Sequence, residues 1–189
     1  MNSFNETGLN QQILQAVQDL GFEKPTPIQI KTIPHLLSSG QDLVAFAQTG
    51  TGKTAAFGLP VVQLTDTENK STQTLILCPT RELCLQITGD LQSFAKYSPV
   101  SIVAVYGGAS IEAQIKALLK SAQIVVATPG RARDLIKRRK LVLNQVARVI
   151  LDEADEMLNM GFKEEIDEIL ESVPTQRQTL LYSATMSKD

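Results

Sequence analysis

Six short apolar runs, each bounded by turn residues, recur along the chain and are hydrophobic almost without interruption. They span residues 43–47, 74–78, 102–106, 124–127, 149–151 and 179–182. Such continuous runs are typical of parallel strands that are buried on both faces of a sheet. Between the runs, apolar residues recur at helical spacing. One such stripe is Leu83, Ile87, Leu91 and Phe94. The pattern predicts an α/β fold with an open, mostly parallel sheet and helices on both faces.

Composition and charge indicate an ordinary globular protein. The 189 residues are 43% hydrophobic and 20% charged, enough for one domain with a proper core. No apolar run approaches the ~20 residues that span a membrane, so we expect no membrane partner. The net charge of -2 argues against bulk electrostatic binding of nucleic acid. Cys78 and Cys84 lack metal or redox spacing and are interpreted as reduced packing residues, which favours a cytoplasmic location.

A glycine-rich turn directly follows the first apolar run, where a helix is expected to begin. The candidate phosphate-binding residues are Gln48, Thr49, Gly50, Thr51, Gly52, Lys53, Thr54 and Ala55. Backbone N–H groups in such a turn can surround phosphates. Lys53 then reaches the β- and γ-phosphates, and the Thr54 hydroxyl holds Mg²⁺. Ala47 occupies the position of the first glycine in the strict motif. An ordinary glycine turn is the alternative, but the following lysine and hydroxyl favour phosphate.

Two carboxylates, Asp152 and Glu153, follow the fifth apolar run. Beside a phosphate loop, Asp152 is expected to hold Mg²⁺ largely through water, because Mg²⁺ dehydrates reluctantly. Glu153 is expected to accept a proton from the water that attacks the γ-phosphate. Together with Lys53 they form the predicted catalytic set. The alternative is an acidic helix start that the helix dipole favours. The upstream phosphate loop favours the magnesium interpretation.

Several short motifs stand in an order that resembles one family. Residues 152–155 read Asp-Glu-Ala-Asp and, with the phosphate loop, the chain resembles the DEAD-box RNA helicases. Residues 21–29 resemble the adenine-reading Q motif, with Phe4 as the upstream aromatic residue. Residues 79–86 resemble motif Ia, although Cys84 replaces the usual alanine. Residues 107–108, 128–131 and 183–185 match the GG element, motif Ib and motif III. The resemblance covers essentially the whole chain.

The resemblance implies a RecA-like ATP-binding domain that uses ATP and Mg²⁺. Residues 1–38 form the Q-motif region, which packs on residues 39–189, and both belong to a single domain. The resemblance further implies that a second RecA-like domain of the same polypeptide completes the ATP site and the RNA contacts. The full-length protein is then an ATP-dependent RNA helicase, and the isolated first domain is expected to be nearly inactive. Two alternatives stay open, a nucleotide-binding interaction module without turnover and a DNA-directed helicase.

The nucleotide base has its own candidate residues. The Gln29 amide can pair with the N6 and N7 edge of adenine, and the Phe4 ring can stack on the base. The alternatives are an exposed helix residue for Gln29 and a core anchor for Phe4. The resemblance favours the nucleotide roles and adds Phe22, Lys24 and Thr26 to the site.

A second group of candidates follows the ends of other predicted strands and therefore gathers along one rim of the sheet. These are Pro79, Thr80, Arg81, Gly107, Gly108, Thr128, Pro129, Gly130 and Arg131. Hydroxyls, N–H groups and guanidiniums suit a sugar–phosphate backbone without reading bases. This is consistent with the sequence-independent grip on RNA that the resemblance implies. Thr80 and Thr128 can also act as helix caps, and both roles are compatible. By analogy with the family, Glu82 pairs with Arg131.

Two further expectations concern the last part of the chain. Ser183 and Thr185 are expected to donate hydrogen bonds to Asp155, and the resemblance implies that this contact couples hydrolysis to unwinding. The alternative is a serine and a threonine that simply close a strand. Residues 131–140 form a basic patch that Asp134 alone opposes in the sequence, and the run 137–140 is interpreted as a solvated helix end.

Overall fold

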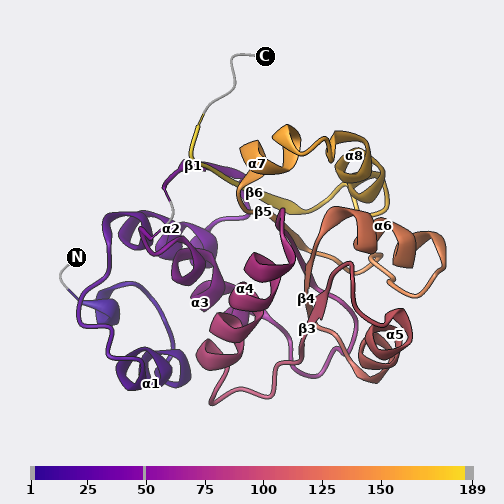
Figure 1. Cartoon of the computed structure of the whole chain (residues 1–189). Helices are drawn as coiled ribbons and strands as arrows, with labels where there is room; N and C mark the ends of the chain where they lie inside the picture. The colour runs from indigo at the N-terminus through magenta and orange to yellow at the C-terminus, as the bar shows by residue number, and fades with distance from the viewer. Residues whose placement is uncertain (1–2, 49, 186–189) are drawn as a thin grey trace.

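The computed structural model describes residues 3–48 and 50–185, and it forms one parallel sheet between two layers of helices (Figure 1). The strands are β1 (Leu43–Phe46), β2 (Thr74–Leu77), β3 (Ile102–Val105), β4 (Ile124–Ala127), β5 (Arg148–Leu151) and β6 (Gln178–Ser183). The helices are α1 (Gln11–Asp19), α2 (Pro27–Ser38), α3 (Lys53–Leu64), α4 (Arg81–Phe94), α5 (Ile111–Lys120), α6 (Pro129–Lys137), α7 (Ala154–Asn159) and α8 (Lys163–Glu171), after a 3₁₀ turn at Phe4–Glu6. Each predicted apolar run coincides with one strand to within one residue at either end.

The strand order is β1-β6-β5-β2-β4-β3, and every pairing is parallel. The predicted open parallel sheet is therefore confirmed. Parallel pairing brings the carboxyl ends of all these strands to one edge of the sheet. The loops after β1, β2, β4, β5 and β6 begin at this edge, and they carry most of the candidate site residues.

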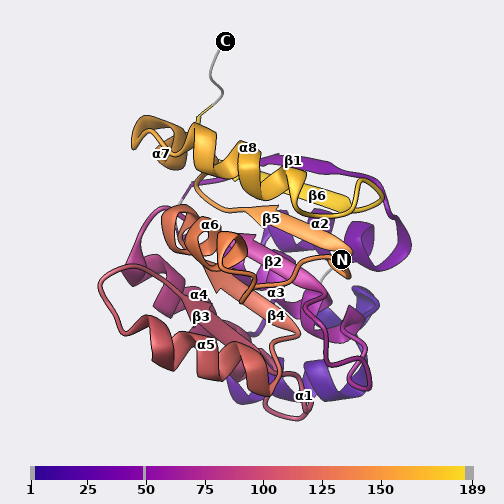
Figure 2. The same cartoon turned by 90° about the vertical axis from the view of Figure 1, so that its right-hand side faces the viewer.

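Alternate strand residues enter two separate cores, one on each face of the sheet. Ile76 of β2 packs into the core that contains Phe57 of α3 and Leu91 of α4. Its neighbours Leu75 and Leu77 enter the other core, with helices α5 to α8. Figure 2 shows α5, α6 and α8 in front of the sheet and α3 and α4 behind it. Burial on both faces explains why these strands are continuously apolar.

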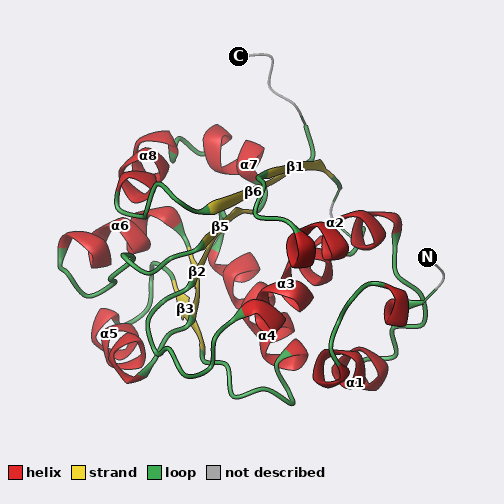
Figure 3. Cartoon of the chain, turned by 180° about the vertical axis from the view of Figure 1, so that it is seen from behind, coloured by secondary structure: helices red, strands yellow, loops and turns green. Residues whose placement is uncertain are grey.

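The N-terminal segment packs on the same core as α3 and α4. Phe4, Ile13 and Ile33 are buried in one cluster with Phe57. Gln63 of α3 binds this segment twice, since its side chain accepts from Asn10 N at 2.7 Å and donates to the Gly8 carbonyl at 3.2 Å. Figure 3 shows α1 and α2 beside α3 and α4, away from the helices of the other face. These contacts hold the N-terminal segment against α3.

Local signals in the sequence explain several helix ends. Ser110 accepts a hydrogen bond from Ala113 N at 3.3 Å, which confirms the predicted cap of α5. Gly21 follows α1 with a φ of 73°, a conformation that favours glycine.

Cys78 and Cys84 are free and fully buried, as predicted. Within the described part of the chain, no helix has the length and apolar character needed to cross a bilayer.

Candidate functional site

A pocket of about 510 Å³ opens at the carboxyl edge of the sheet and brings together residues from four separate parts of the sequence. Its predicted members are Phe4, Phe22, Lys24, Thr26, Gln29, Gly50, Gly52, Lys53, Thr54, Ala55, Asp152 and Glu153. Gln48 and Thr51 do not line it; the Thr51 hydroxyl donates to the Gln48 carbonyl at 2.7 Å within the loop. Thr49, also predicted here, lies outside the described residues.

The loop before α3 depends on its glycines. Gly50 and Gly52 have φ values of 83° and 88°, in the left-handed region that side chains disfavour. Gly52 is also crowded, since an added Cβ lies 2.6 Å from Gln29 Nε2. Helix α3 begins at Lys53, directly after this turn. The first N–H groups of a helix have no partners within the helix and favour an anion.

Gln29 links the segment before α2 to this loop. Its Oε1 accepts from Thr26 N at 2.9 Å, and its Nε2 donates to the Gly52 carbonyl at 3.2 Å. The side chain is 4% exposed, so the alternative of an exposed helix residue is wrong. The adenine-reading role stays a prediction.

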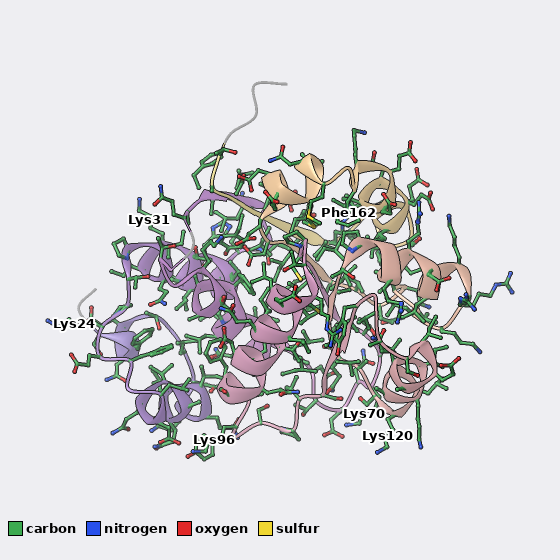
Figure 4. The ribbon with its side chains drawn as sticks, viewed as in Figure 1. Lys24, Lys31, Lys70, Lys96, Lys120 and Phe162 are labelled. Atoms are coloured by element: carbon green, nitrogen blue, oxygen red, sulfur yellow. The ribbon has the colours of Figure 1, made fainter. Side chains whose placement is uncertain are left out.

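Three aromatic rings form one end of the pocket. The Phe4 and Phe22 ring centroids lie 6.2 Å apart, and those of Phe22 and Phe94 lie 6.4 Å apart. Phe4 is buried in the hydrophobic core, which agrees with the alternative that it is a core anchor. It also lines the pocket. Phe22 is 38% exposed and presents the more open ring. Lys24, between α1 and α2, projects at the edge of the molecule (Figure 4).

The opposite end of the pocket contains a buried ion pair. Lys53 Nζ lies 3.4 Å from Asp152 Oδ1, and these side chains are 7% and 2% exposed. Burial raises the pKa of Asp152, while the neighbouring Lys53 cation lowers it, and the raising effect is larger. Asp152 Oδ1 also accepts from Glu153 N at 3.0 Å. Glu153 has a φ of 53°, an uncommon backbone conformation for a residue that is not glycine.

The donor set suits a magnesium ion that is shared with a phosphate ligand. The described residues contain no group of three or more His, Cys, Asp or Glu side chains that could hold a metal by themselves. Mg²⁺ commonly uses one or two carboxylates, several waters and substrate phosphates. Asp152 and the Thr54 hydroxyl are hard oxygen donors that line the same pocket.

The strand ends also bring the second group of candidates to the rim. The Thr80 hydroxyl accepts from Leu83 N at 3.2 Å and caps α4, as predicted. Thr128 precedes α6, but its hydroxyl makes no capping hydrogen bond, so that part of the prediction is wrong. Arg81 is exposed, and its guanidinium lies 5.1 Å from the centre of the Tyr106 ring. The other candidates here include the exposed Gly107 and Gly108, the buried Pro79 and Pro129, and Gly130.

Arg131 has different partners from the predicted one. Its guanidinium donates to the Ala109 carbonyl at 3.1 and 3.2 Å and to Gln114 Oε1 at 2.9 Å. The described residues contain no Glu82–Arg131 ion pair, because these acceptors already hold the guanidinium and Glu82 is exposed. Gln114 was not among the site residues predicted from the sequence. A polar residue within the apolar stripe of α5 was its one signal, and it is only 7% exposed.

Asp155 holds the segment that follows β6. Its Oδ2 accepts from Thr185 Oγ1 at 2.8 Å, from Thr185 N at 3.0 Å and from Ala184 N at 3.2 Å. Burial tends to raise the pKa of Asp155, but the hydrogen bonds to its carboxylate have the larger effect and hold the pKa below its usual value. The predicted Thr185 contact is thus present. A side-chain hydrogen bond from Ser183 also helps to lower the pKa of Asp155, and the Ser183 hydroxyl donates to the Thr185 carbonyl at 2.5 Å as well.

The basic patch is more neutral than the sequence suggested. Arg133 lies 3.2 Å from a Glu165 oxygen, and Lys137 lies 2.7 Å from a Glu168 oxygen. Packing of α6 against α8 supplies these carboxylates, so the expectation that Asp134 alone opposes the patch is wrong. Helix α6 ends at Lys137, in agreement with a solvated helix end.

The pocket has a wall that the motifs did not reveal. Besides Leu20, it consists of Leu83, Gln86, Asp90, Ser93 and Phe94, which all belong to α4. Their contribution depends on how α4 packs against α3, which no local motif encodes.

The parallel sheet, the glycine loop at the start of α3 and the acidic end of β5 define a P-loop nucleotide-binding domain of the α/β class. The family model for DEAD/DEAH box helicases matches residues 26–189. The chain therefore belongs to the DEAD/DEAH box helicase family.

Individual relatives agree with this assignment. The chain is 53% identical over 186 residues to the DEAD-box ATP-dependent RNA helicase CshA of Bacillus cereus, and this covers 98% of the chain and 35% of the relative. A crystal structure of a DEAD box protein from Methanococcus jannaschii superposes with a TM-score of 0.96 at 46% identity, over 100% of this chain and 51% of that one. The RNA helicase Prp28 from Chaetomium thermophilum, bound to ADP, gives a TM-score of 0.90 at 43% identity, over 100% of this chain and 46% of that one. The fold is the RecA-like domain of these proteins. The chain spans about a third of the length of the curated relatives.

Proposed function

We propose that this chain is the ATP-binding domain of an ATP-dependent RNA helicase, with residues 1–38 and 39–189 acting as one domain. The observation that carries the proposal is the pocket of about 510 Å³, which gathers the phosphate loop, Gln29 and the Asp152–Glu153 pair. A phosphate chain fits the N–H groups at the start of α3, while the aromatic end offers a surface for a base. Gln29 then selects adenine, because its Nε2 has a second N–H and its Oε1 a second lone pair beyond those that the Gly52 carbonyl and Thr26 N engage.

Each residue has a chemical role in this proposal. Lys53 binds the β- and γ-phosphates, and it separates from Asp152 to do so. Asp152 and Thr54 hold Mg²⁺, which neutralises phosphate charge when bound. Glu153 orients the attacking water and accepts its proton. The ion pair in the free protein keeps both buried charges compensated until nucleotide enters.

RNA and a second domain complete the proposed activity. The rim that includes Thr80, Arg81, Gly108 and Arg131 suits a sugar–phosphate backbone and reads no bases. A second RecA-like domain of the same polypeptide supplies the remaining contacts, and closure of the two domains separates a short duplex. Asp155 and Thr185 connect the nucleotide site to the segment after β6. The cytoplasmic location stays a prediction from the reduced cysteines.

Titration calorimetry of this chain with ADP, ATP and GDP in magnesium buffer tests the nucleotide site. We expect saturable binding of ADP and ATP, much weaker binding of GDP, and loss of the preference for adenine in Gln29→Ala. Absence of any heat with adenine nucleotides would refute the proposal.

A second assay tests turnover in the full-length protein. We expect single-stranded RNA to stimulate ATP hydrolysis, and Glu153→Gln to abolish hydrolysis while ATP binding persists. Full-length protein that binds ATP without RNA-stimulated hydrolysis would favour the non-catalytic module. Equal stimulation by DNA would favour a DNA-directed helicase.

A further inference from the structure

One face of α4 lines the nucleotide pocket, and the proposed function does not use it. Its residues Leu83, Gln86, Asp90, Ser93 and Phe94 follow helical spacing and form a single stripe. At 1.5 Å per residue, the stripe runs for about 16 Å along the pocket. A wall of this length accompanies a bound nucleotide over much of its extent.

The direction of α4 indicates which part of a nucleotide each residue faces. The helix begins at Arg81, at the carboxyl end of β2, and β2 pairs with β5, which ends beside Asp152. Leu83 therefore lies toward the phosphate end. Phe94 lies at the aromatic end, 6.4 Å from Phe22 between ring centroids. Asp90 lies between them, about 10 Å along the helix from Leu83 and about 6 Å from Phe94. This is where the sugar joins the base to the phosphates.

Asp90 has an unused carboxylate at this position. No hydrogen bond or ion pair reaches it within residues 3–48 and 50–185. It is half-buried, and burial raises the pKa of its carboxyl group. An ionised carboxylate only accepts hydrogen bonds, and sugar hydroxyls can donate them. Carboxylates of this kind bind the ribose hydroxyls in other nucleotide-binding folds.

We propose that Asp90 accepts hydrogen bonds from the ribose hydroxyls of the bound nucleotide and thereby favours ribonucleotides over deoxyribonucleotides. This inference rests on the proposed ATP-binding function. It adds a sugar-specificity residue to a site whose other predicted residues contact the base, the phosphates and the metal.

Calorimetric titration with unlabelled ADP, 2′-deoxy-ADP and 3′-deoxy-ADP tests the inference, since labels on the ribose would block the hydroxyls. The wild-type chain is expected to bind ADP about tenfold more tightly than at least one deoxy analogue, the effect of one hydrogen bond to a charged group. Asp90→Ala is expected to bind ADP and both analogues equally. Asp90→Asn keeps a neutral acceptor, which is about half as strong, so a preference of about threefold should persist. Glu164→Ala, at an exposed acid of α8 outside the pocket, should leave the preference unchanged.

The outcomes are separable. Equal wild-type affinity for ADP and both deoxy analogues would overturn the ribose contact and leave the nucleotide site intact. An equal change in affinity for all three ligands in Asp90→Ala, including tighter binding after loss of a repelling charge, would also overturn it. Failure of the wild-type chain to bind ADP at all would instead refute the proposed function. If Asp90→Ala does not fold, the isosteric Asp90→Asn still decides, because an unchanged tenfold preference contradicts the inference.

Discussion

Gly52 cannot carry a side chain without displacing Gln29, so Gly52→Ala tests the link between α2 and the phosphate loop. The φ of 88° costs an L-residue about 1–2 kcal/mol. The new Cβ would lie 2.6 Å from Gln29 Nε2, the end of a flexible side chain that can move aside. Gln29 then loses its hydrogen bonds to the Gly52 carbonyl and from Thr26 N, each worth about 1 kcal/mol. The expected loss in the free energy of unfolding is about 3–4 kcal/mol.

Gly50→Ala is the matched control. Gly50 has a φ of 83°, and no atom lies within 4 Å of the position that a Cβ would take there, so only the backbone cost of about 1–2 kcal/mol applies. Urea unfolding followed by far-ultraviolet circular dichroism measures both variants, because the chain has no tryptophan to report by fluorescence. The difference between the two glycines, about 2 kcal/mol, isolates the displacement of Gln29.

A double-mutant cycle completes the test. In a Gln29→Ala background, the closest obstacle to the new Cβ at position 52 is gone and Thr26 Oγ1, at 3.2 Å, is the nearest remaining atom, so Gly52→Ala should cost little more than its backbone contribution. The cycle should therefore give an interaction energy of about 2 kcal/mol. Equal destabilisation by Gly50→Ala and Gly52→Ala, or the same cost of Gly52→Ala with and without Gln29, would refute the reasoning.

Three other predictions concern the remaining contacts. Lys53→Met removes the cation that opposes the burial-raised pKa of Asp152. The folded pKa then lies further above the unfolded value of 3.8, so the variant's stability relative to wild type should be greatest below pH 3.8 and fall as pH rises through the folded pKa. Urea unfolding at several pH values checks this against the exposed-site control Lys31→Met, and a pH-independent difference from wild type would contradict it. Gln114→Ala removes the acceptor of Arg131 and the donor to the Tyr106 carbonyl, and should cost about 2 kcal/mol in unfolding experiments, whereas Lys116→Ala on the exposed side of α5 should cost almost nothing. Asp155→Ala should speed amide hydrogen exchange at Ala184 and Thr185 about tenfold, because their shared acceptor is lost; unchanged exchange, or the same effect in Glu156→Ala, would count against that contact.

The strands could be predicted because short, continuous apolar runs bounded by turn residues are typical of strands buried in a parallel sheet. The prediction of burial on both faces was wrong for β1, where Val44 and Phe46 are 59% and 52% exposed. β1 stands at the edge of the sheet, and its outward side chains have no covering helix among the described residues. An apolar run shows that a strand forms, whereas its place in the sheet depends on partners elsewhere in the sequence.

The candidate site likewise contains residues that the sequence could predict and a contact that it could not. Gly50, Gly52 and Thr80 follow from local backbone requirements, which neighbouring residues in the sequence determine. The partner of Arg131 does not. A guanidinium offers five donors in a fixed fork and binds whichever acceptors surround it. Here the packing of α5 against β3 brings the Ala109 carbonyl and Gln114 within 3.2 Å, while Glu82 stays in solvent. Opposite charge in the sequence is therefore weaker evidence for a contact than a buried polar residue on a helix that must pack nearby.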